Sequence, residues 1–384
     1  MNWLFPSDSI TLLLVMIVLY GSLYWLKYSK KELLEKYGIT IDNFAVFIRT
    51  KKLNNFISNI GYKYRKFWKI ISIIGILVSI YLAGIGLLFI HQNLLGLLFK
   101  KPTASPVTPL IPGITIGINT LPYFIIAFLL VLIPHEFFHG FIAASEKINI
   151  KSAGLFFFTV FFGGFVEPDE EEFNKSNLLA KIRVYVAGSF ANFLTYLLLL
   201  AIFIQFIHPS GVLVVATLPE YPAYNILQKN DIIVGLNNTK INNIQDLTNF
   251  MDKTKPGDIV IIKILRDHQE KNIVLTLGKS PNNPNQGFIG IKLENYFKNK
   301  FLYHTLWWSL IITSSAAVIN MLPIVPFDGG QILSNLLAYF FRNHGGKKIS
   351  DKITYVISIY IGLILILNIL LSFNIWGFGI GIYP

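Results

Sequence analysis

The sequence predicts a polytopic α-helical membrane protein of about six transmembrane helices, with an inserted small α+β domain and a membrane re-entrant β-hairpin. Three observations predict this class. Of the 384 residues, 53% are hydrophobic and only 14% are charged, which is more apolar than ordinary soluble domains. Several windows of about 20 apolar residues are long enough to cross the hydrocarbon core of a bilayer. Between two of these windows lies a polar segment rich in β-branched residues.

The apolar windows give the expected spans, which are 10–26, 70–90, 121–144, 178–207, 301–322 and 353–373. The first window lacks a basic leader and an A-x-A cleavage site, so we expect a retained span rather than a removed signal peptide. Lysines and arginines are densest between Lys27 and Lys69. Because positive loops favour the cytoplasmic side, this basic loop is expected there, which places both termini outside a cell membrane crossed several times.

The formal net charge of +12 does not indicate nucleic acid as a partner. The positive residues gather in short loops beside the apolar windows, as the lipid bilayer and its anionic headgroups favour, rather than on one globular face. No GxxxxGK[ST] phosphate loop is present. Cysteine is absent, which excludes disulfides and thiolate metal sites. Any metal must therefore be held by nitrogen and oxygen ligands.

The soluble segment, residues 211–295, is expected on the extracytoplasmic side. Strands are predicted at 211–218, 230–238, 257–267 and 272–278, and a short helix at 244–253. This order of elements resembles a PDZ domain, a fold that takes an extended peptide along an exposed strand edge beside a helix. A peptide is therefore a possible ligand here. The alternative is a structural ectodomain that binds nothing.

Residues 153–168, AGLFFFTVFFGGFVEP, are aromatic, strand-prone and too short to span the membrane. Non-helical backbone at membrane depth survives only where it packs in protein or faces a cavity, so we expect a re-entrant hairpin that ends in Gly163 and Gly164. An interfacial loop with an aromatic belt is the alternative. The acidic residues that follow, 169–172, are expected to form a solvated turn.

The third span contains HEFFH, in which His135 and His139 lie four residues apart. Residues at this spacing share one face of a helix, so both rings can bind one metal ion. Glu136 lies about 100 degrees round the helix, where it can act as a general base on a metal-bound water. Ionisable groups inside a membrane are costly, which favours a function. The alternative is that neighbouring polar groups satisfy the histidines.

A catalytic zinc needs a third protein ligand, and the sequence offers two sources. A metzincin site is excluded, because isoleucine and serine stand at positions 142 and 145. A downstream glutamate could serve, either Glu167 or one of residues 170–172. The other source is Asp328 in NMLPIVPFDGGQ, residues 320–331, which the topology places on the cytoplasmic side at about the depth of His139. Glycines after Asp328 would let the backbone approach the metal closely.

HEFFH combined with the later N-x-x-P-x-x-x-x-D-G motif resembles the site-2 protease family of intramembrane zinc metalloproteases. The resemblance implies one Zn²⁺ per chain, ligated by His135, His139 and Asp328, with Glu136 as catalytic base. It also implies that Asn320 positions the substrate or stabilises the oxyanion. The remaining candidate residues are Asn192 in AGSFAN, for which an interhelical hydrogen bond is expected, and Gly163, Gly164 and Phe165, whose hairpin is implied to pair with an unwound substrate helix.

The resemblance implies an intramembrane zinc endopeptidase that cleaves transmembrane segments of membrane proteins near the cytoplasmic face, after a first cleavage outside. The PDZ-like domain would filter access. The expected division is 1–120 for N-terminal helices and the basic loop, 121–210 and 296–384 for the two halves of the catalytic core, and 211–295 for the PDZ-like domain. Two alternatives remain, a zinc-binding transporter or sensor in which Glu136 is dispensable, and a non-catalytic PDZ-bearing membrane adaptor.

Overall fold

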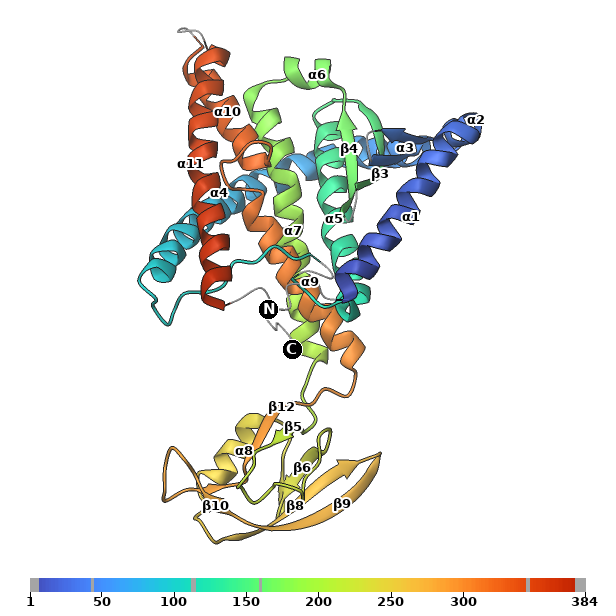
Figure 1. The fold of residues 1–384 in the computed structure, drawn as a ribbon. Helices are drawn as coiled ribbons and strands as arrows, with labels where there is room; N and C mark the ends of the chain where they lie inside the picture. The colour runs from blue at the N-terminus through green and yellow to red at the C-terminus, as the bar shows by residue number, and fades with distance from the viewer. Residues whose placement is uncertain (1–6, 43–44, 112–114, 159–160, 343–345, 377–384) are drawn as a thin grey trace. The chain divides into compact units, whose positions relative to one another are not determined.

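The computed structural model describes residues 7–42, 45–111, 115–158, 161–342 and 346–376. The chain forms two compact units (Figure 1), one of residues Met1–Leu200 and Thr305–Pro384 and the other of residues Ala201–His304. The first unit holds most of the long helices and the HEFFH motif. The second unit contains the small β-rich domain.

Within the described residues, five helices are long and apolar enough to cross a membrane, and they coincide with five of the six expected windows. Their bounds are α4 (Arg65–Leu98), η1 with α5 (Ile118–Thr120, Leu121–Ser145), α7 (Leu178–Phe206), α9 (Lys300–Ile319) and α11 (Gly346–Trp376). The expected first span, 10–26, lies in α1 (Ser7–Ser29), which is not among the five. A polytopic helical protein is thus confirmed, while the sixth span stays a prediction.

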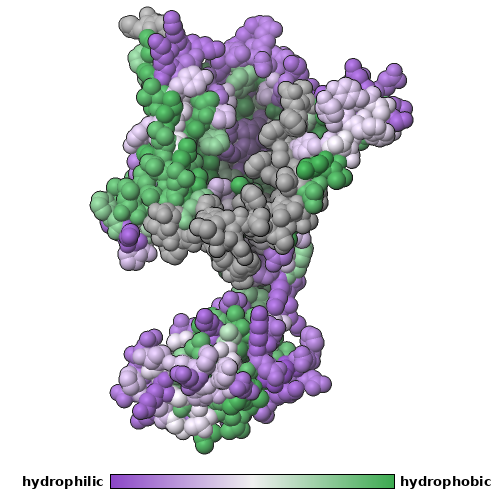
Figure 2. Space-filling view, in the orientation of Figure 1, coloured by the Kyte–Doolittle hydropathy of each residue, from purple (hydrophilic) through white to green (hydrophobic). Residues whose placement is uncertain are grey.

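The outer faces of α4 and α11 are apolar and exposed, as lipid-facing helices require. Figure 2 shows hydrophobic side chains over this part of the first unit. Large hydrophobic residues exposed on α11 include Tyr355, Val356, Ile359, Leu363, Ile366 and Leu370. Inward, small residues allow close packing: a Cβ on Gly86 of α4 would lie 2.8 Å from Val318 of α9. Hydrophobic surface therefore faces out, and small residues face in.

The basic segment predicted as a loop is folded instead. It contains α2 (Lys31–Lys36), β1 (Ile39–Asp42), β2 (Ala45–Arg49) and α3 (Lys51–Lys63). Strand β2 pairs with β3 (Ile150–Phe158), and β3 pairs with β4 (Phe161–Pro168), giving an antiparallel sheet in the order β1-β2-β3-β4. Its β-branched and aromatic residues, AVFIR in β2, suit a pleated surface. The expectation of a basic connecting loop rested on charge alone and did not identify these short runs.

The aromatic segment forms the predicted hairpin, β3 and β4, which lies beside α5 (Figure 1). Gly163 and Gly164 lie within β4 rather than at the end of the hairpin. The close approach of a ring requires the first glycine, since a Cβ on Gly163 would lie 2.1 Å from the Phe156 ring. The turn residues 159–160 lie outside the described residues. The expected acidic turn is instead α6 (Glu170–Lys175), whose first turn is capped by the Asp169 side chain.

The second unit has the predicted α+β composition. Its main sheet has the order β12-β5-β6-β8-β9 with β7 beside β6, and its core is built from inward residues of these strands and of α8. The buried Asp231 carboxylate and the partly exposed Arg266 guanidinium form a two-point ion pair with 2.7 Å contacts, which raises the pKa of the Arg266 guanidinium. The element bounds are β5 (Val212–Thr217), β6 (Ile232–Leu236), β7 (Thr239–Lys240), α8 (Ile244–Met251), β8 (Ile259–Arg266), β9 (Gln269–Thr276), β10 (Gly278–Lys279), β11 (Gly287–Phe288) and β12 (Ile291–Asn295).

Candidate metal centre

The two histidines of HEFFH lie on one face of α5, with their Nε2 atoms 3.2 Å apart. Asp328 comes from the first turn of α10 (Asp328–Phe340), nearly 200 residues away in sequence. Its Oδ2 atom lies 3.7 Å from His135 Nε2 and 3.4 Å from His139 Nε2. Among the described residues this is the one group of three His, Asp or Glu side chains whose ligand atoms converge within 4.8 Å.

These distances suit a zinc ion. A tetrahedral zinc with bonds of about 2.0–2.2 Å holds its ligand atoms roughly 3.3–3.6 Å apart, close to the three separations found here. The tautomer of His139 also suits it. Its Nδ1 lies 2.6 Å from the carbonyl oxygen of Val184, and because a carbonyl can only accept, Nδ1 carries the proton and leaves the lone pair of Nε2 for a metal. Two imidazoles and a carboxylate, without thiolates, form a donor set typical of catalytic zinc.

Helix α7 passes directly behind the histidine rings, and Gly188 makes this possible. A Cβ on Gly188 would lie 2.4 Å from His135 Cε1 and 2.4 Å from His139 Nε2. No side chain fits in that space. One turn further along α7, the Asn192 amide lies 3.0 Å from Nδ1 of His135, which is the interhelical hydrogen bond expected for this residue.

A tight turn before α10 positions Asp328. The Gly329 N–H donates to the carbonyl oxygen of Asn320 at 2.8 Å, which closes the loop between the two motif ends. Cβ atoms on Gly329 and Gly330 would lie 2.3 to 2.6 Å from backbone atoms of residues 321–325. We expected these glycines to let the backbone approach the metal. Their contacts are instead with the preceding loop, so they allow α10 to pack against it and so fix Asp328.

Glu136 points toward the sheet, where its Oε2 accepts a hydrogen bond of 3.1 Å from the Val166 N–H of β4. It lines a cavity of about 940 Å³ together with both histidines and Asp328. Asn320 and Phe165 line the same cavity. Gly164 lies beside Glu136, since a Cβ there would be 3.2 Å from Glu136 Cγ, whereas Gly163 lies under Phe156. The cavity thus combines the metal-ligand group, a carboxylate and the outer strand of the sheet.

The glutamates considered as alternative third ligands do not join the metal-ligand group. Glu167 and Glu170 line the cavity, but neither belongs to the converging set found among the described residues. Glu167 is engaged elsewhere, 2.5 Å from the Ser152 hydroxyl and 3.7 Å from Lys151 Nζ. Of the two sources that the sequence offers, the geometry therefore favours Asp328.

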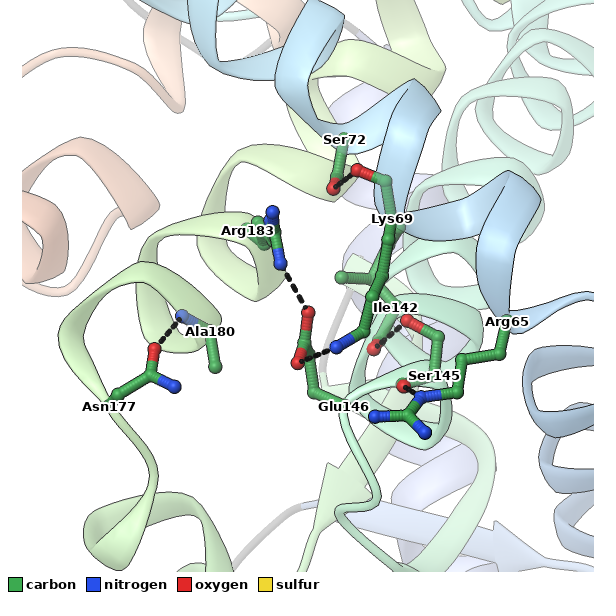
Figure 3. A network of polar contacts seen from close by, with 9 residues as sticks. All are labelled: Arg65, Lys69, Ser72, Ile142, Ser145, Glu146, Asn177, Ala180 and Arg183. Carbon is green, nitrogen blue, oxygen red and sulfur yellow. Dashed lines mark hydrogen bonds and ion pairs between the residues drawn. The ribbon is translucent and has the colours of Figure 1, made fainter.

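A buried ion-pair network holds three helices together just beyond the metal site (Figure 3). Glu146, at the end of α5, is 7% exposed and lies 2.9 Å from Lys69 Nζ of α4 and 2.8 Å from an Arg183 nitrogen of α7. Arg183 immediately precedes Val184, whose carbonyl orients His139. This network therefore fixes the part of α7 that supports a metal ligand.

Several side chains of the cavity carry no motif and were not identified from the sequence. Phe47 and Arg49 come from β2, and Tyr185 comes from α7. Their positions depend on pairing between distant segments, β2 with β3 and α7 with α5. The sequence signal was one aromatic and one charged residue two positions apart in AVFIR, Phe47 and Arg49, and this signal is weak by itself.

The chain is similar to known proteins over most of its length. The profile of peptidase family M50 matches residues 123–367. An uncharacterized protein of Methanocaldococcus jannaschii is 31% identical over 342 residues, 85% of each chain. A membrane-bound transcription factor site-2 protease homolog of Arabidopsis thaliana is 24% identical over 237 residues. The match covers 58% of this chain and 44% of that protein. A solved PDZ domain of an SdrC-like protein from Listeria monocytogenes is 24% identical over 22% of this chain and 87% of its own, with a TM-score of 0.21.

Proposed function

The chain belongs to peptidase family M50, and from this premise we propose that it hydrolyses peptide bonds in or near transmembrane segments of membrane proteins, with Glu136 as general base. Membership of the family makes the chain a metalloprotease of the site-2 protease type. The proposal extends this to one Zn²⁺ held by His135, His139 and Asp328. The observation that carries it is the convergence of these three ligand atoms within 4.8 Å in a cavity that also contains Glu136.

The chemistry follows from the positions of the side chains. Bound zinc would act as a Lewis acid toward the scissile carbonyl and the attacking water. Glu136 would take the proton of that water and deliver it to the leaving amine. Its hydrogen bond to Val166 holds the carboxylate at the wall of the cavity until substrate enters. Asn320, which lines the same cavity, is the proposed donor to the developing oxyanion.

The proposed substrate-binding element is the free edge of β4. A transmembrane helix hides its peptide bonds, so a substrate must unwind, and its freed backbone groups need partners inside the membrane. Strand β4 is the last in its sheet, with β3 on one side. An extended substrate segment added along Gly163, Gly164 and Phe165 would regain backbone hydrogen bonds and lie beside Glu136.

The remaining parts of the proposal concern topology and partners. Positive charge in the 27–69 segment favours a cytoplasmic location, with both termini and the PDZ-like domain outside and the active site toward the cytoplasm. The PDZ-like domain, 211–295, would admit substrates already trimmed outside, or bind a peptide. The membrane core would be completed by residues 121–210 and 296–384, with 1–120 preceding it. Cleavage after such trimming is regulated intramembrane proteolysis.

The experiment that tests the function uses the full chain in liposomes with a single-span reporter. Wild type, Glu136→Gln and Glu170→Gln are compared for cleavage and for zinc content. Glu170 is the matched control, a carboxylate that lines the cavity outside the ligand group. We expect one zinc in all three and at least a hundredfold slower cleavage in Glu136→Gln alone, the usual cost of losing a positioned base.

Other outcomes favour the alternatives. Undiminished cleavage by Glu136→Gln would contradict the role of this residue as base. Zinc in every variant with no cleavage by wild type would favour the transporter or sensor, which metal flux across the same liposomes would detect. An absence of both zinc and cleavage would favour the adaptor.

A further inference from the structure

The cavity receives side chains from a part of the chain that precedes the family match. The M50 profile begins at residue 123, whereas Ala45, Phe47 and Arg49 of β2 line the cavity together with Glu136 and Asp328. Strand β2 reaches the site because it pairs with β3 over residues 45–49. The site therefore has a wall that the matched region does not supply.

The register of the sheet places Arg49 on the same face as Phe165 of β4, the strand along which substrate is proposed to bind. Arg49 is opposite Gly154 of β3, and Gly154 is opposite Phe165 of β4. Directly opposed residues of antiparallel strands point to the same face of a sheet. Because Gly154 has no side chain, the guanidinium of Arg49 extends over it and lies 5.5 Å from the centroid of the Phe165 ring.

Two aromatic rings and one hydroxyl hold the guanidinium. Its Cζ lies 4.9 Å from the centroid of the Phe47 ring, in addition to the Phe165 contact. One nitrogen, Nη1, donates to the Thr40 hydroxyl of β1 at 2.5 Å. The cation–π contacts and this hydrogen bond restrict the long side chain, so less conformational entropy is lost when it binds a ligand.

Arg49 donates from Nη1 to Thr40, so other N–H groups of its guanidinium remain for a ligand. The ion pairs found among the side chains that the structure describes do not include Arg49, whereas Glu167, on the same cavity wall, is paired with Lys151. Of the side chains that line the cavity in the described part of the chain, Arg49 is the only lysine or arginine. A guanidinium fork matches a carboxylate in two parallel hydrogen bonds.

We propose that Arg49 is a specificity-determining residue that selects substrates carrying a carboxylate on the segment laid along β4. The inference rests on the proposed function, because it takes the free edge of β4 as the substrate site. The carboxylate is either an Asp or Glu side chain or the free C-terminus of a trimmed substrate. Since side chains alternate between the two faces of a strand, the preference belongs to positions on the Arg49 face and is absent at the positions on either side.

The test is a set of reporters that differ in one residue. Glu is placed in turn at each of six positions around the cleaved bond of a full-length single-span reporter, with Gln at the same position as its partner. A further pair ends near the bond, one with a free C-terminus and one amidated. Wild type, Arg49→Gln, Arg49→Lys and Lys52→Gln are compared in liposomes. Lys52 is the control, an exposed cation near Arg49 in sequence that does not line the cavity.

We expect wild type to prefer one Glu reporter, or the free C-terminus, by about fivefold in kcat/KM, which corresponds to the upper end of the range for a solvent-accessible ion pair. The effect should appear mainly in KM. Arg49→Gln should lose this preference, so that it cleaves the Glu reporter and its Gln partner with the same kcat/KM. Arg49→Lys should keep part of the preference, and Lys52→Gln should keep all of it. A preference for a Glu reporter would identify the carboxylate as a side chain, and a preference for the free C-terminus would identify it as the end of a trimmed substrate.

Reversing the charge at position 49 distinguishes a change in specificity from a loss of folding. Arg49→Glu should cleave the reporter with Lys faster than the one with Glu at the position where wild type prefers Glu. Wild type that cleaves every reporter equally, or a preference that survives Arg49→Gln, would overturn the inference and leave the proteolytic function standing. A wild type that loads zinc and cleaves no reporter would overturn the proposed function and this inference together.

Discussion

The side-chain amide of Asn192 on α7 lies 3.0 Å from Nδ1 of His135 on α5. A histidine that offers Nε2 to a metal carries its proton on Nδ1, so the atom opposite Nδ1 must accept a hydrogen bond. The structure places Nδ2 of the Asn192 amide against Nδ1 and leaves Oδ1 buried without a partner. The two ends of the amide have nearly the same shape, so turning the amide over presents Oδ1 as the acceptor. His135 and His139 are then both oriented by α7, one by a side chain and one by the Val184 carbonyl.

Asn192→Leu should therefore bind zinc 10- to 100-fold more weakly, the usual range for losing a group that orients a metal ligand. Asn192→Asp, which keeps an acceptor of the same shape, should retain zinc near the wild-type level. Competition with a chelator of known affinity measures both. Equal zinc affinity in Leu and Asp variants would show that the hydrogen bond is merely structural.

Gly188→Ala gives a second test of the site. The added Cβ would lie within 2.5 Å of atoms on both histidine rings. These atoms are the ends of rotatable side chains, so the helices can stay packed while the rings turn away, and Nε2 is misplaced. We expect a folded protein that loses zinc and cleavage together. Gly84→Ala on α4 is the control, because a Cβ there meets nothing within 4 Å and should leave zinc binding unchanged.

Glu146→Ala should destabilise the protein, because it leaves Lys69 and Arg183 without the partner that they share in a largely buried site. Removing one member of a buried ion pair costs about 3–5 kcal/mol, and here the loss should also weaken zinc binding through Val184. Thermal unfolding in detergent, followed with and without zinc, measures both effects. Glu171→Ala removes an exposed pair with Lys175 and should change neither. A stable Glu146→Ala protein with normal zinc affinity would contradict this account.

Local patterns in the sequence were sufficient for much of the site. His135 and His139 share a face because of helical periodicity, and the hydrophobic windows gave five helices with ends that differ by up to eight residues. The hairpin 153–168 was predictable because aromatic and β-branched residues in a segment too short to span leave few alternatives. These features depend on neighbours in the sequence.

Features that depend on distant pairing were not predictable in the same way. Strands β1 and β2 are only four and five residues long, and their role emerges only when β2 pairs with β3, about 100 residues later. Glu146 and Arg183 are ordinary charged residues at helix ends until α5 and α7 bring them within 2.8 Å. Helix α10 was missed because DGG normally indicates a turn, and here the glycines serve close packing against residues 321–325.

The free edge of β4 leads to a last prediction. The N–H of Val166 points away from β3 to Glu136, and the direction alternates along a strand. The N–H of Gly164, two residues earlier, therefore also points to the open edge. If substrate pairs there, this N–H is one of its donors, whereas the N–H of Phe165 faces β3 and holds the hairpin.

Gly164→Pro should remove the edge donor and cut cleavage at least tenfold while zinc content stays at one per chain, because the metal ligands lie on other elements. Gly164→Ala separates the effect of the lost donor from that of added bulk, since its Cβ approaches Glu136 and Leu132 to 3.2 and 3.3 Å without removing the N–H. Cleavage of a single-span reporter and zinc content are measured for both variants. Equal losses for Ala and Pro would mean that space beside Glu136 matters rather than the donor, and loss of zinc in Pro would mean that β4 is needed to build the metal site.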